Sequence, residues 1–240
     1  PDEPGRLAAL RRLNILDTLP QHAFDSLTAL AAGICGTPIA LISLVDSDRQ
    51  WFKSRLGTGL TQTPRSEAFC AHAILAPTEV LVVNNASEDA RFENFSMVRS
   101  GELVFYAGAP IVTSGGAALG TVCVLDSHPR ELDEVQLDML RHLADVAMHL
   151  IEHEHSRREQ SEQMVGQIVK GQQIIRDVLN EGADMAAFID RDHTYRFVNP
   201  AFQRYWTLEP QAIMGMQVHD LIDRTSYRAL FKPSINQALA

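Results

Sequence analysis

The chain has 240 residues, of which 45% are apolar, and a formal net charge of -9 at pH 7. This apolar fraction is ordinary for a chain that buries a core, so long disordered stretches are not expected. Nucleic-acid binding needs Lys and Arg side chains that neutralise phosphates, and the acidic balance argues against such a partner. No apolar run reaches the roughly 18–20 residues that span a bilayer, so we expect no membrane span in this segment and a cytoplasmic location.

The first part of the chain predicts two helices followed by a β-hairpin. Leucines at helical spacing predict a helix over residues 6–16, and a second helix is expected to end at Gly36. The apolar run 38–45 and the alternating run 50–56 are predicted strands. The polar stretch 46–49 between them predicts the turn of a hairpin.

The middle of the chain predicts the remainder of an antiparallel sheet. A helix is expected over residues 66–75, with Ser66 as its N-cap, and a strand over residues 80–83. Two strong strands, 105–112 and 117–125, are separated by a Gly-rich turn that is typical of a hairpin. Because strands in hairpins run antiparallel and the helices need a sheet to cover, the predicted fold class is α+β.

Residues 133–180 contain no proline and are dominated by helix formers, which predicts one long helix. With Leu140 at position a and Leu143 at position d, a heptad frame recurs to the end of this stretch. The further apolar members of the frame are Ala147, Leu150, Met164, Ile168, Ile175 and Val178. Four polar or small residues interrupt it: Glu154, Arg157, Ser161 and Gly171. We expect a weak parallel seam that forms a homodimer; the alternative is a single exposed connecting helix.

The last stretch predicts a second, smaller α/β unit. Residues 186–190 and 195–198 are predicted strands around a turn, and Pro200 stands where a helix tolerates proline, at its start. The predicted division of the chain is therefore a sensory domain over residues 1–152, a linker helix over 153–180 and a partial domain over 181–240.

Five separated blocks of the first domain follow one another in a characteristic order. They are Ile39–Asp46, Arg49–Ser54, Phe69–Ile74, Phe105–Pro110 and Gly120–Asp126. In these blocks the chain closely resembles the GAF domains of bacterial signalling proteins, over about residues 5–152. The resemblance implies an antiparallel sheet flanked by helices, and a domain that senses a small molecule or serves as a dimerisation and relay unit.

A second resemblance rests on three shorter blocks: Phe188–Asp190, Val198–Phe202 and Ile213–Gly215. They are similar to the front half of PAS domains, over about residues 178–240. Proteins with this pairing often continue into a diguanylate cyclase, a phosphodiesterase or a histidine kinase. None of these outputs is recognisable in this sequence, so the resemblance implies an input module that is not itself an enzyme.

The resemblance to GAF domains implies a small-molecule pocket over the sheet, lined by the last hairpin and by the helix after Arg65. The candidate lining residues are Phe69, Cys70, His72, Phe105, Tyr106, Thr121 and Cys123. The hydroxyls of Tyr106 and Thr121 would orient a ligand in a mostly apolar cavity. The alternative is that these residues fill the core. The ligand and any cofactor are not identifiable, because the sequence has neither a CxxCH haem-attachment motif nor a dinucleotide fingerprint.

The sequence does not favour a catalytic site or a metal site. A one-residue gap on a helix points Cys70 and His72 about 200° apart, which argues against a catalytic dyad. His149 and His153 have the spacing of two zinc ligands on one helical face, but no third ligand completes a site. A thiol-dependent redox enzyme using Cys70 and Cys123 stays open as the least favoured alternative, after a ligand sensor and a ligand-free dimerisation scaffold.

Overall fold

The computed structural model describes residues 2–181 and 184–239. The chain divides into two compact units, Pro1–Gln160 and Ser161–Ala240, and this division falls inside the predicted linker. The first unit contains the elements α1 (Glu3–Arg12), α2 (His22–Cys35), β1 (Ile39–Val45), β2 (Arg49–Leu56), β3 (Gln62–Pro64), η1 (Arg65–Glu67), α3 (Phe69–Ala73), β4 (Leu81–Val83), η2 (Ala86–Glu88), α4 (Ser96–Arg99), β5 (Phe105–Val112) and β6 (Ala118–Asp126). Helix α5 (Glu134–Glu181) begins in the first unit and ends in the second.

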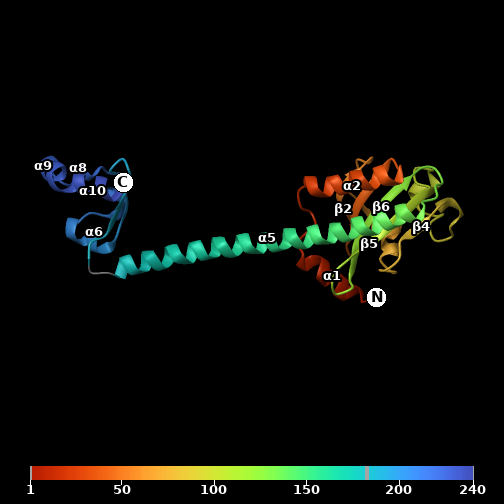
Figure 1. The fold of residues 1–240 in the computed structure, drawn as a ribbon. Helices are drawn as coiled ribbons and strands as arrows, with labels where there is room; N and C mark the ends of the chain where they lie inside the picture. Colours follow the sequence, from red (N-terminus) through yellow and green to blue (C-terminus); the bar gives the residue numbers. More distant parts are fainter. Residues whose placement is uncertain (1, 182–183, 240) are drawn as a thin grey trace. The chain divides into compact units, whose positions relative to one another are not determined.

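The first unit is built on one six-stranded antiparallel sheet with the strand order β3-β2-β1-β6-β5-β4 (Figure 1). The predicted hairpins β1–β2 and β5–β6 are confirmed, and β1 joins them by pairing with β6. Gly120 permits this central pairing, because a Cβ there would lie 1.9 Å from the carbonyl oxygen of Ser43. The predicted α+β fold is therefore confirmed.

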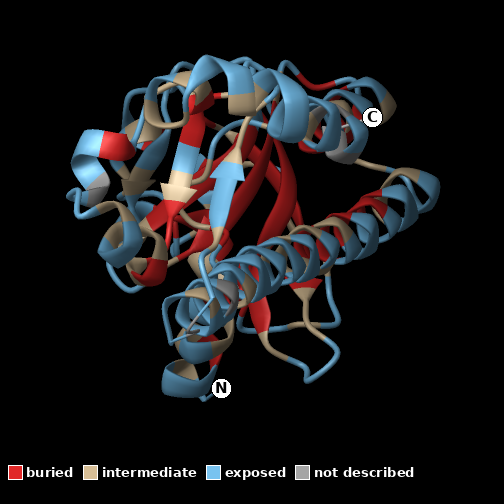
Figure 2. Cartoon of the chain, turned by 90° about the vertical axis from the view of Figure 1, so that its left-hand side faces the viewer, coloured by how far each residue is buried: buried red, intermediate tan, exposed pale blue. Residues whose placement is uncertain are grey.

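The two faces of the sheet carry different cores, because successive side chains of a strand point to opposite faces. On one face, α1, α2 and the first part of α5 cover the sheet. The buried residues there include Leu10, Phe24, Ala31, Ile42, Phe105, Val122, Val124, Leu140, Ala144 and Ala147. On the other face lie α3, α4 and the segments around them, which pack on Leu41, Phe52, Tyr106, Cys123 and Leu125. Figure 2 shows the buried strands in red beneath largely exposed helix surfaces.

Local signals explain where the first helices end. Helix α2 ends as predicted at Gly36, which adopts a left-handed conformation with φ of 63°. Helix α1 begins after Asp2, whose carboxylate caps it by accepting the N–H of Gly5, and it ends at Arg12. The prediction that it continues to residue 16 is wrong, because Asn14 leaves the helical region with φ of 51°.

The segment after β2 differs from the sequence prediction. A single helix over residues 66–75 is wrong: η1 ends at Glu67, Ala68 is extended with φ of -103°, and α3 begins at Phe69. Ser66 therefore lies inside η1 and is not an N-cap. The short edge strand β3 was not predicted, because its three residues include Pro64 and show no apolar alternation.

The first half of α5 uses its apolar stripe inside the chain. Leu140, Leu143 and Ala147 are 0%, 9% and 0% exposed and belong to the core against the sheet. The prediction that Leu140 and Leu143 open a dimer seam is therefore wrong. In the second half, Met164 and Val178 are 65% and 66% exposed. The side chain of Ile175, another predicted seam position, lies outside the described residues.

The second unit has a small core of its own. Its elements after α5 are β7 (Ala187–Ile189), β8 (Tyr195–Val198), α6 (Pro200–Trp206), α7 (Pro210–Ile213), α8 (Val218–Leu221), α9 (Arg224–Ser226), the π-helical turn η3 (Tyr227–Phe231) and α10 (Lys232–Leu239). The predicted hairpin is confirmed as the antiparallel pair β7–β8, and Pro200 begins α6 as predicted. In residues 2–181 and 184–239, no helix is long and apolar enough to cross a membrane.

Candidate functional site

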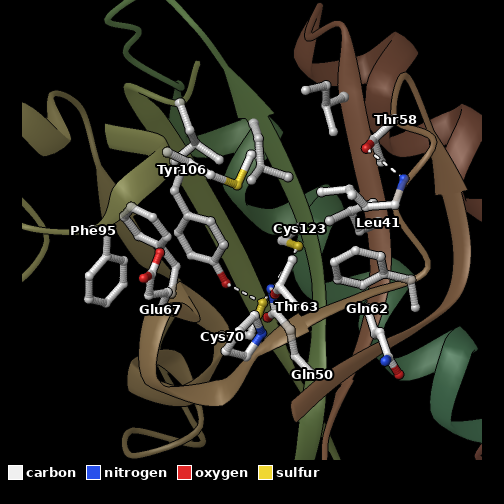
Figure 3. Close-up of a pocket in the computed structure, with 18 of the residues that line it drawn as sticks. Leu41, Gln50, Thr58, Gln62, Thr63, Glu67, Cys70, Phe95, Tyr106 and Cys123 are labelled. Atoms are coloured by element: carbon white, nitrogen blue, oxygen red, sulfur yellow. Dashed lines mark hydrogen bonds between the residues drawn. The ribbon is translucent and has the colours of Figure 1, made fainter. Parts of the chain in front are cut away.

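A cavity of about 310 Å³ lies on the face of the sheet that α2 and α5 do not cover (Figure 3). Its walls come from strands β1, β2, β3, β5 and β6, from η1, α3 and α4, and from the loops that contain Thr58, Leu60, Phe95 and Leu103. The lining side chains include Leu41, Gln50, Phe52, Leu60, Gln62, Thr63, Glu67, Phe69, Cys70, Phe95, Met97, Leu103, Tyr106, Cys123 and Leu125. Most of these side chains are apolar, so the cavity offers a hydrophobic interior with a few polar groups.

Aromatic rings form one wall of the cavity. The ring of Phe69 stacks on Phe92, with centroids 4.3 Å apart, and on Tyr106, with centroids 5.0 Å apart. Phe95 meets Phe69 edge to face at 5.4 Å and an interplanar angle of 81°. Stacked and edge-to-face pairs are the favoured geometries of aromatic rings, so this wall is held by mutual packing and presents flat apolar surface to the cavity.

Two thiols lie together at the floor of the cavity. The Sγ atoms of Cys70, on α3, and Cys123, on β6, are 3.9 Å apart. Cys70 Sγ also accepts hydrogen bonds from Thr121 Oγ1 at 3.1 Å and from the Tyr106 hydroxyl at 3.4 Å. Figure 3 shows the Tyr106 hydroxyl directed at Cys70. The Tyr106 ring lies over Gly108, where a Cβ would come within 2.1 Å of the phenol oxygen.

These contacts separate the acidities of the two thiols. Burial opposes ionisation of Cys70, but hydrogen bonds from Cys123, Thr121 and other neighbouring donors outweigh it and lower its pKa to about 6. Burial, together with the adjacent Cys70, raises the pKa of Cys123 well above its ordinary value. Of the two thiols, Cys70 is therefore the one that ionises more readily, and the thiolate is the nucleophilic form of cysteine.

The polar groups of the lining mostly satisfy one another. Gln50 donates to Thr63 Oγ1 at 2.7 Å and accepts from Ser43 Oγ at 3.3 Å. Gln62 Oε1 accepts from Arg49 at 2.7 Å. Paired amides and hydroxyls of this kind fix the shape of the wall without adding charge to the cavity.

Glu67 joins two segments of the lining. Its Oε2 atom accepts the backbone N–H of Ser96 at 3.0 Å and also the Ser96 hydroxyl. These hydrogen bonds, the hydroxyl first and the backbone N–H second, lower the pKa of Glu67. The carboxylate is therefore ionised at neutral pH and connects η1 to the start of α4.

The sequence-predicted residues do not all reach the cavity. Phe69, Cys70, Tyr106 and Cys123 line it, and Thr121 lies behind the lining, bonded to Cys70. His72 turns away and meets the ring of Phe92 edge to face at 4.9 Å.

Phe105 is buried on the opposite face of the sheet, because its neighbour Tyr106 faces the cavity and strand side chains alternate. Phe105 is therefore removed from the set of candidate ligand contacts.

Sequence reasoning missed a part of the lining that lies in loops and short helical segments. Phe95 and Met97 come from a stretch for which no helix or strand was predicted, and Glu67 lies in η1, at the start of the wrongly predicted helix 66–75. Leu41 and Phe52 lie in predicted strands, and alternation alone does not tell which face of a sheet is hollow.

Comparisons with known proteins agree with this architecture. The family model described as GAF domain matches residues 20–151, and the one described as PAS fold matches residues 179–240. A cyclic di-GMP phosphodiesterase of Pseudomonas aeruginosa is 41% identical over 149 residues, which make up 61% of this chain and 25% of that protein. The match thus spans about a quarter of that relative's length.

Solved structures give the same kind of match at low identity. The GAF domain of an Acinetobacter phosphoenolpyruvate-protein phosphotransferase is 20% identical with a TM-score of 0.48, covering 65% of this chain and 98% of that one. The GAF domain of the corresponding protein of Coxiella burnetii is 12% identical with a TM-score of 0.49, covering 66% and 99%.

Proposed function

The chain belongs to the GAF domain family, and on this premise we propose that it is the sensory input module of a bacterial signal-transduction protein, whose GAF domain binds a small molecule in the cavity beside β6. GAF and PAS domains together indicate a signalling sensory module. The partial match to a phosphodiesterase covers a quarter of that enzyme, so the output (a diguanylate cyclase, phosphodiesterase or histidine kinase) is proposed to lie outside this sequence.

The observation that carries the proposal is the cavity itself. It is partly open to solvent at the exposed residues Glu67 and Ser96 and has a mostly apolar lining. A cavity of about 310 Å³ has the volume of about ten water molecules in the liquid and falls within the range of small-molecule sites. What sets this cavity apart is its mostly apolar lining with a few polar groups, which is the usual composition of a small-molecule site. This favours ligand binding over the scaffold alternative.

Strand β6 connects the cavity to α5. Cys123 and Leu125 face the cavity, while Val122 and Val124 between them pack in the core that includes the first half of α5. At the end of the same strand the buried carboxylate of Asp126 binds Arg130, in the segment that leads into α5. A ligand that favours one position of β6 would therefore shift the helix, to the extent of its differential affinity for the two arrangements.

We also propose that the second half of α5 pairs with a second copy of itself to form a homodimer. Its exposed apolar side chains include Met164, Val165, Ile168, Val169 and Val178, each more than half exposed. Met164, Ile168 and Val178 share the heptad frame, which a second copy of the helix would cover. Met164→Cys is expected to crosslink between copies under oxidation, and Gln163→Cys, one position away, is the matched control. The proposed homodimer would be rejected if both variants crosslinked equally, or if the protein sedimented as a monomer at high concentration.

Ligand binding is tested by a thermal-shift screen against metabolites, followed by native mass spectrometry of the hits. A true ligand raises the melting temperature in proportion to the logarithm of its concentration above Kd. Met97→Trp, which fills the cavity from a half-buried lining position, should abolish the shift; Met139→Trp, on the outer face of α5, should preserve it. A shift that both variants retain would contradict binding in this cavity.

A thiol-dependent redox activity is the second candidate, because Cys70 and Cys123 lie 3.9 Å apart in the cavity. Hydrogen peroxide would take two electrons and two protons from the pair, forming one S–S bond as the O–O bond breaks and leaving two waters. Intact mass should then fall by two hydrogen atoms and recover with a thiol reductant. Cys35, a third buried thiol whose pKa is raised to about 11 by burial, is the control. The mass change should disappear in Cys70→Ser and persist in Cys35→Ser. The opposite result would reject this activity.

A further inference from the structure

The cavity is surrounded by negative and neutral groups. Among the side chains that line it in the described residues there is no Lys, Arg or His, and Glu67 is a carboxylate. The second acidic group is Cys70, whose thiolate is stabilised by neighbouring donors. Nothing in this lining compensates a negative charge brought in by a ligand.

Four cations of the surrounding segments are engaged elsewhere, while Arg55 on β2 and Arg99 on α4 are exposed and do not line the cavity. Arg49 pairs with Asp17 at 2.6 Å and donates at 2.7 Å to the lining residue Gln62, although Arg49 itself does not line the cavity. Arg91 forms an ion pair with Asp89 at 2.7 Å.

Lys53 points to the opposite side of the sheet, where its Nζ donates to Thr18 and to the carbonyl of Leu19. Arg65 binds Glu3 at 2.6 Å. Each of these four cations would have to leave a partner in order to reach an anionic ligand.

We propose that the cavity selects a small uncharged or singly positive molecule that has an apolar ring and one N–H or O–H donor, and that it rejects anions, phosphate-bearing nucleotides included. This rests on the proposed ligand-sensing function and names the chemical class that the same site takes. Moving an anion from water into an apolar site without a counter-charge carries a large desolvation penalty. The carboxylate of Glu67 adds repulsion to that penalty.

The hydrogen bonds of the Glu67 carboxylate indicate how the cavity would recognise the N–H or O–H donor of a ligand. Both hydrogen bonds from Ser96 go to Oε2, and Oε1 has no partner in the part of the chain that the structure describes. The backbone N–H at the start of α4, which an anion would otherwise use, is already taken by Glu67. The free carboxylate oxygen is therefore positioned to accept an N–H or O–H from a ligand whose ring packs against Phe69 and Phe95.

The test uses three probes that share one phenyl ring and differ in their head group: 2-phenylethylamine, 2-phenylethanol and 3-phenylpropionate. Titration of the full chain should give the amine and the alcohol affinities at least about tenfold higher than the carboxylate. The carboxylate of Glu67 should also make the amine bind more tightly than the alcohol, and this difference should disappear in Glu67→Gln. In Glu67→Lys, the carboxylate should gain about tenfold, while the exposed Glu79→Lys variant, with the same change of net charge, should keep the wild-type order.

Each outcome decides a different claim. If 3-phenylpropionate or cyclic GMP binds as tightly as the amine and Met97→Trp abolishes that binding, the charge selectivity is overturned and the ligand-sensing function survives. If none of the probes binds at millimolar concentration, the selectivity as stated is rejected. If the metabolite screen then also yields no ligand, the proposed function falls with it. If the order of affinities is unchanged in Glu67→Lys, Glu67 is not the residue that determines the charge selectivity.

Discussion

The two faces of the same sheet are built for different tasks. The face under α2 and α5 is filled by Ile, Leu, Val and Ala side chains with Phe24 and Phe105 among them. The opposite face combines stacked rings, two thiols and hydroxyl groups around a cavity. Strands β5 and β6 supply residues to both faces because their side chains alternate. Neighbouring residues of one strand therefore belong either to the filled face or to the face of the proposed binding cavity, and mutations of such neighbours should have different effects.

The largest expected effect is on the filled face. Phe105→Ala removes a fully buried ring and should lower the free energy of unfolding by about 3–5 kcal/mol, since the transfer and cavity terms add. Chemical denaturation of the variant measures this loss. Met139→Ala, at an exposed position of α5, is the control and should change stability little. A loss below about 1 kcal/mol for Phe105→Ala would mean that the helix-covered face is not the main source of stability.

The next effect is a pH dependence on the same face. Burial, followed by the charge of Arg158, lowers the pKa of Lys53 to about 8 from its ordinary 10.5. Between these two values the unfolded chain binds the proton more tightly, so stability rises with pH in that window, by on the order of 2–3 kcal/mol.

Denaturation between pH 7.5 and 10.5 should show the rise in the wild type and lose it in Lys53→Met. Because other groups titrate there too, the difference between the two curves is the quantity to compare. A flat difference would show that Lys53 is protonated equally in the folded and unfolded chains.

On the cavity face, a mutation of Tyr106 should change the pKa of Cys70 more than it changes the stability of the fold. Tyr106→Phe keeps the ring and removes one hydrogen bond to Cys70, for an expected loss of about 1 kcal/mol. The pKa of Cys70 should rise, because one donor to the thiolate is lost. Thiolate absorbance as a function of pH measures this shift, with Cys70→Ser as the blank. An unchanged pKa together with a large loss of stability would place Tyr106 among the packing residues instead.

The smallest effect is expected where the cavity meets solvent. Ser96→Ala removes the hydroxyl that is the first cause of the lowered pKa of Glu67, so that pKa should move up towards its ordinary value. Carboxyl chemical shifts followed by NMR during an acid titration report it, and Ser100→Ala is the control on the same loop. Stability at neutral pH should stay almost constant, since the group is exposed. A fall in stability as large as that of Tyr106→Phe would contradict this.

The sequence by itself was sufficient for the elements whose signals are local. Gly36 ends α2 because glycine adopts a left-handed conformation at low cost, and the Gly-rich turn before residue 117 joins two strands that pair as predicted. The absence of proline over residues 133–180 was enough to predict α5 as one helix. Four of the candidate site residues, Phe69, Cys70, Tyr106 and Cys123, were also found to line the cavity.

Only the tertiary structure decided what covers each apolar face. Periodicity tells that Leu140 and Leu143 share one side of a helix, but the same pattern suits a second copy and the chain's own sheet equally well. It likewise separates Phe105 from Tyr106 without telling which of them faces a hollow. That depends on short segments distant in sequence, such as η1 with Glu67 and α4 with Met97, and on the missing side chain of Gly108. Burial is a property of three-dimensional neighbours, and a local pattern does not contain them.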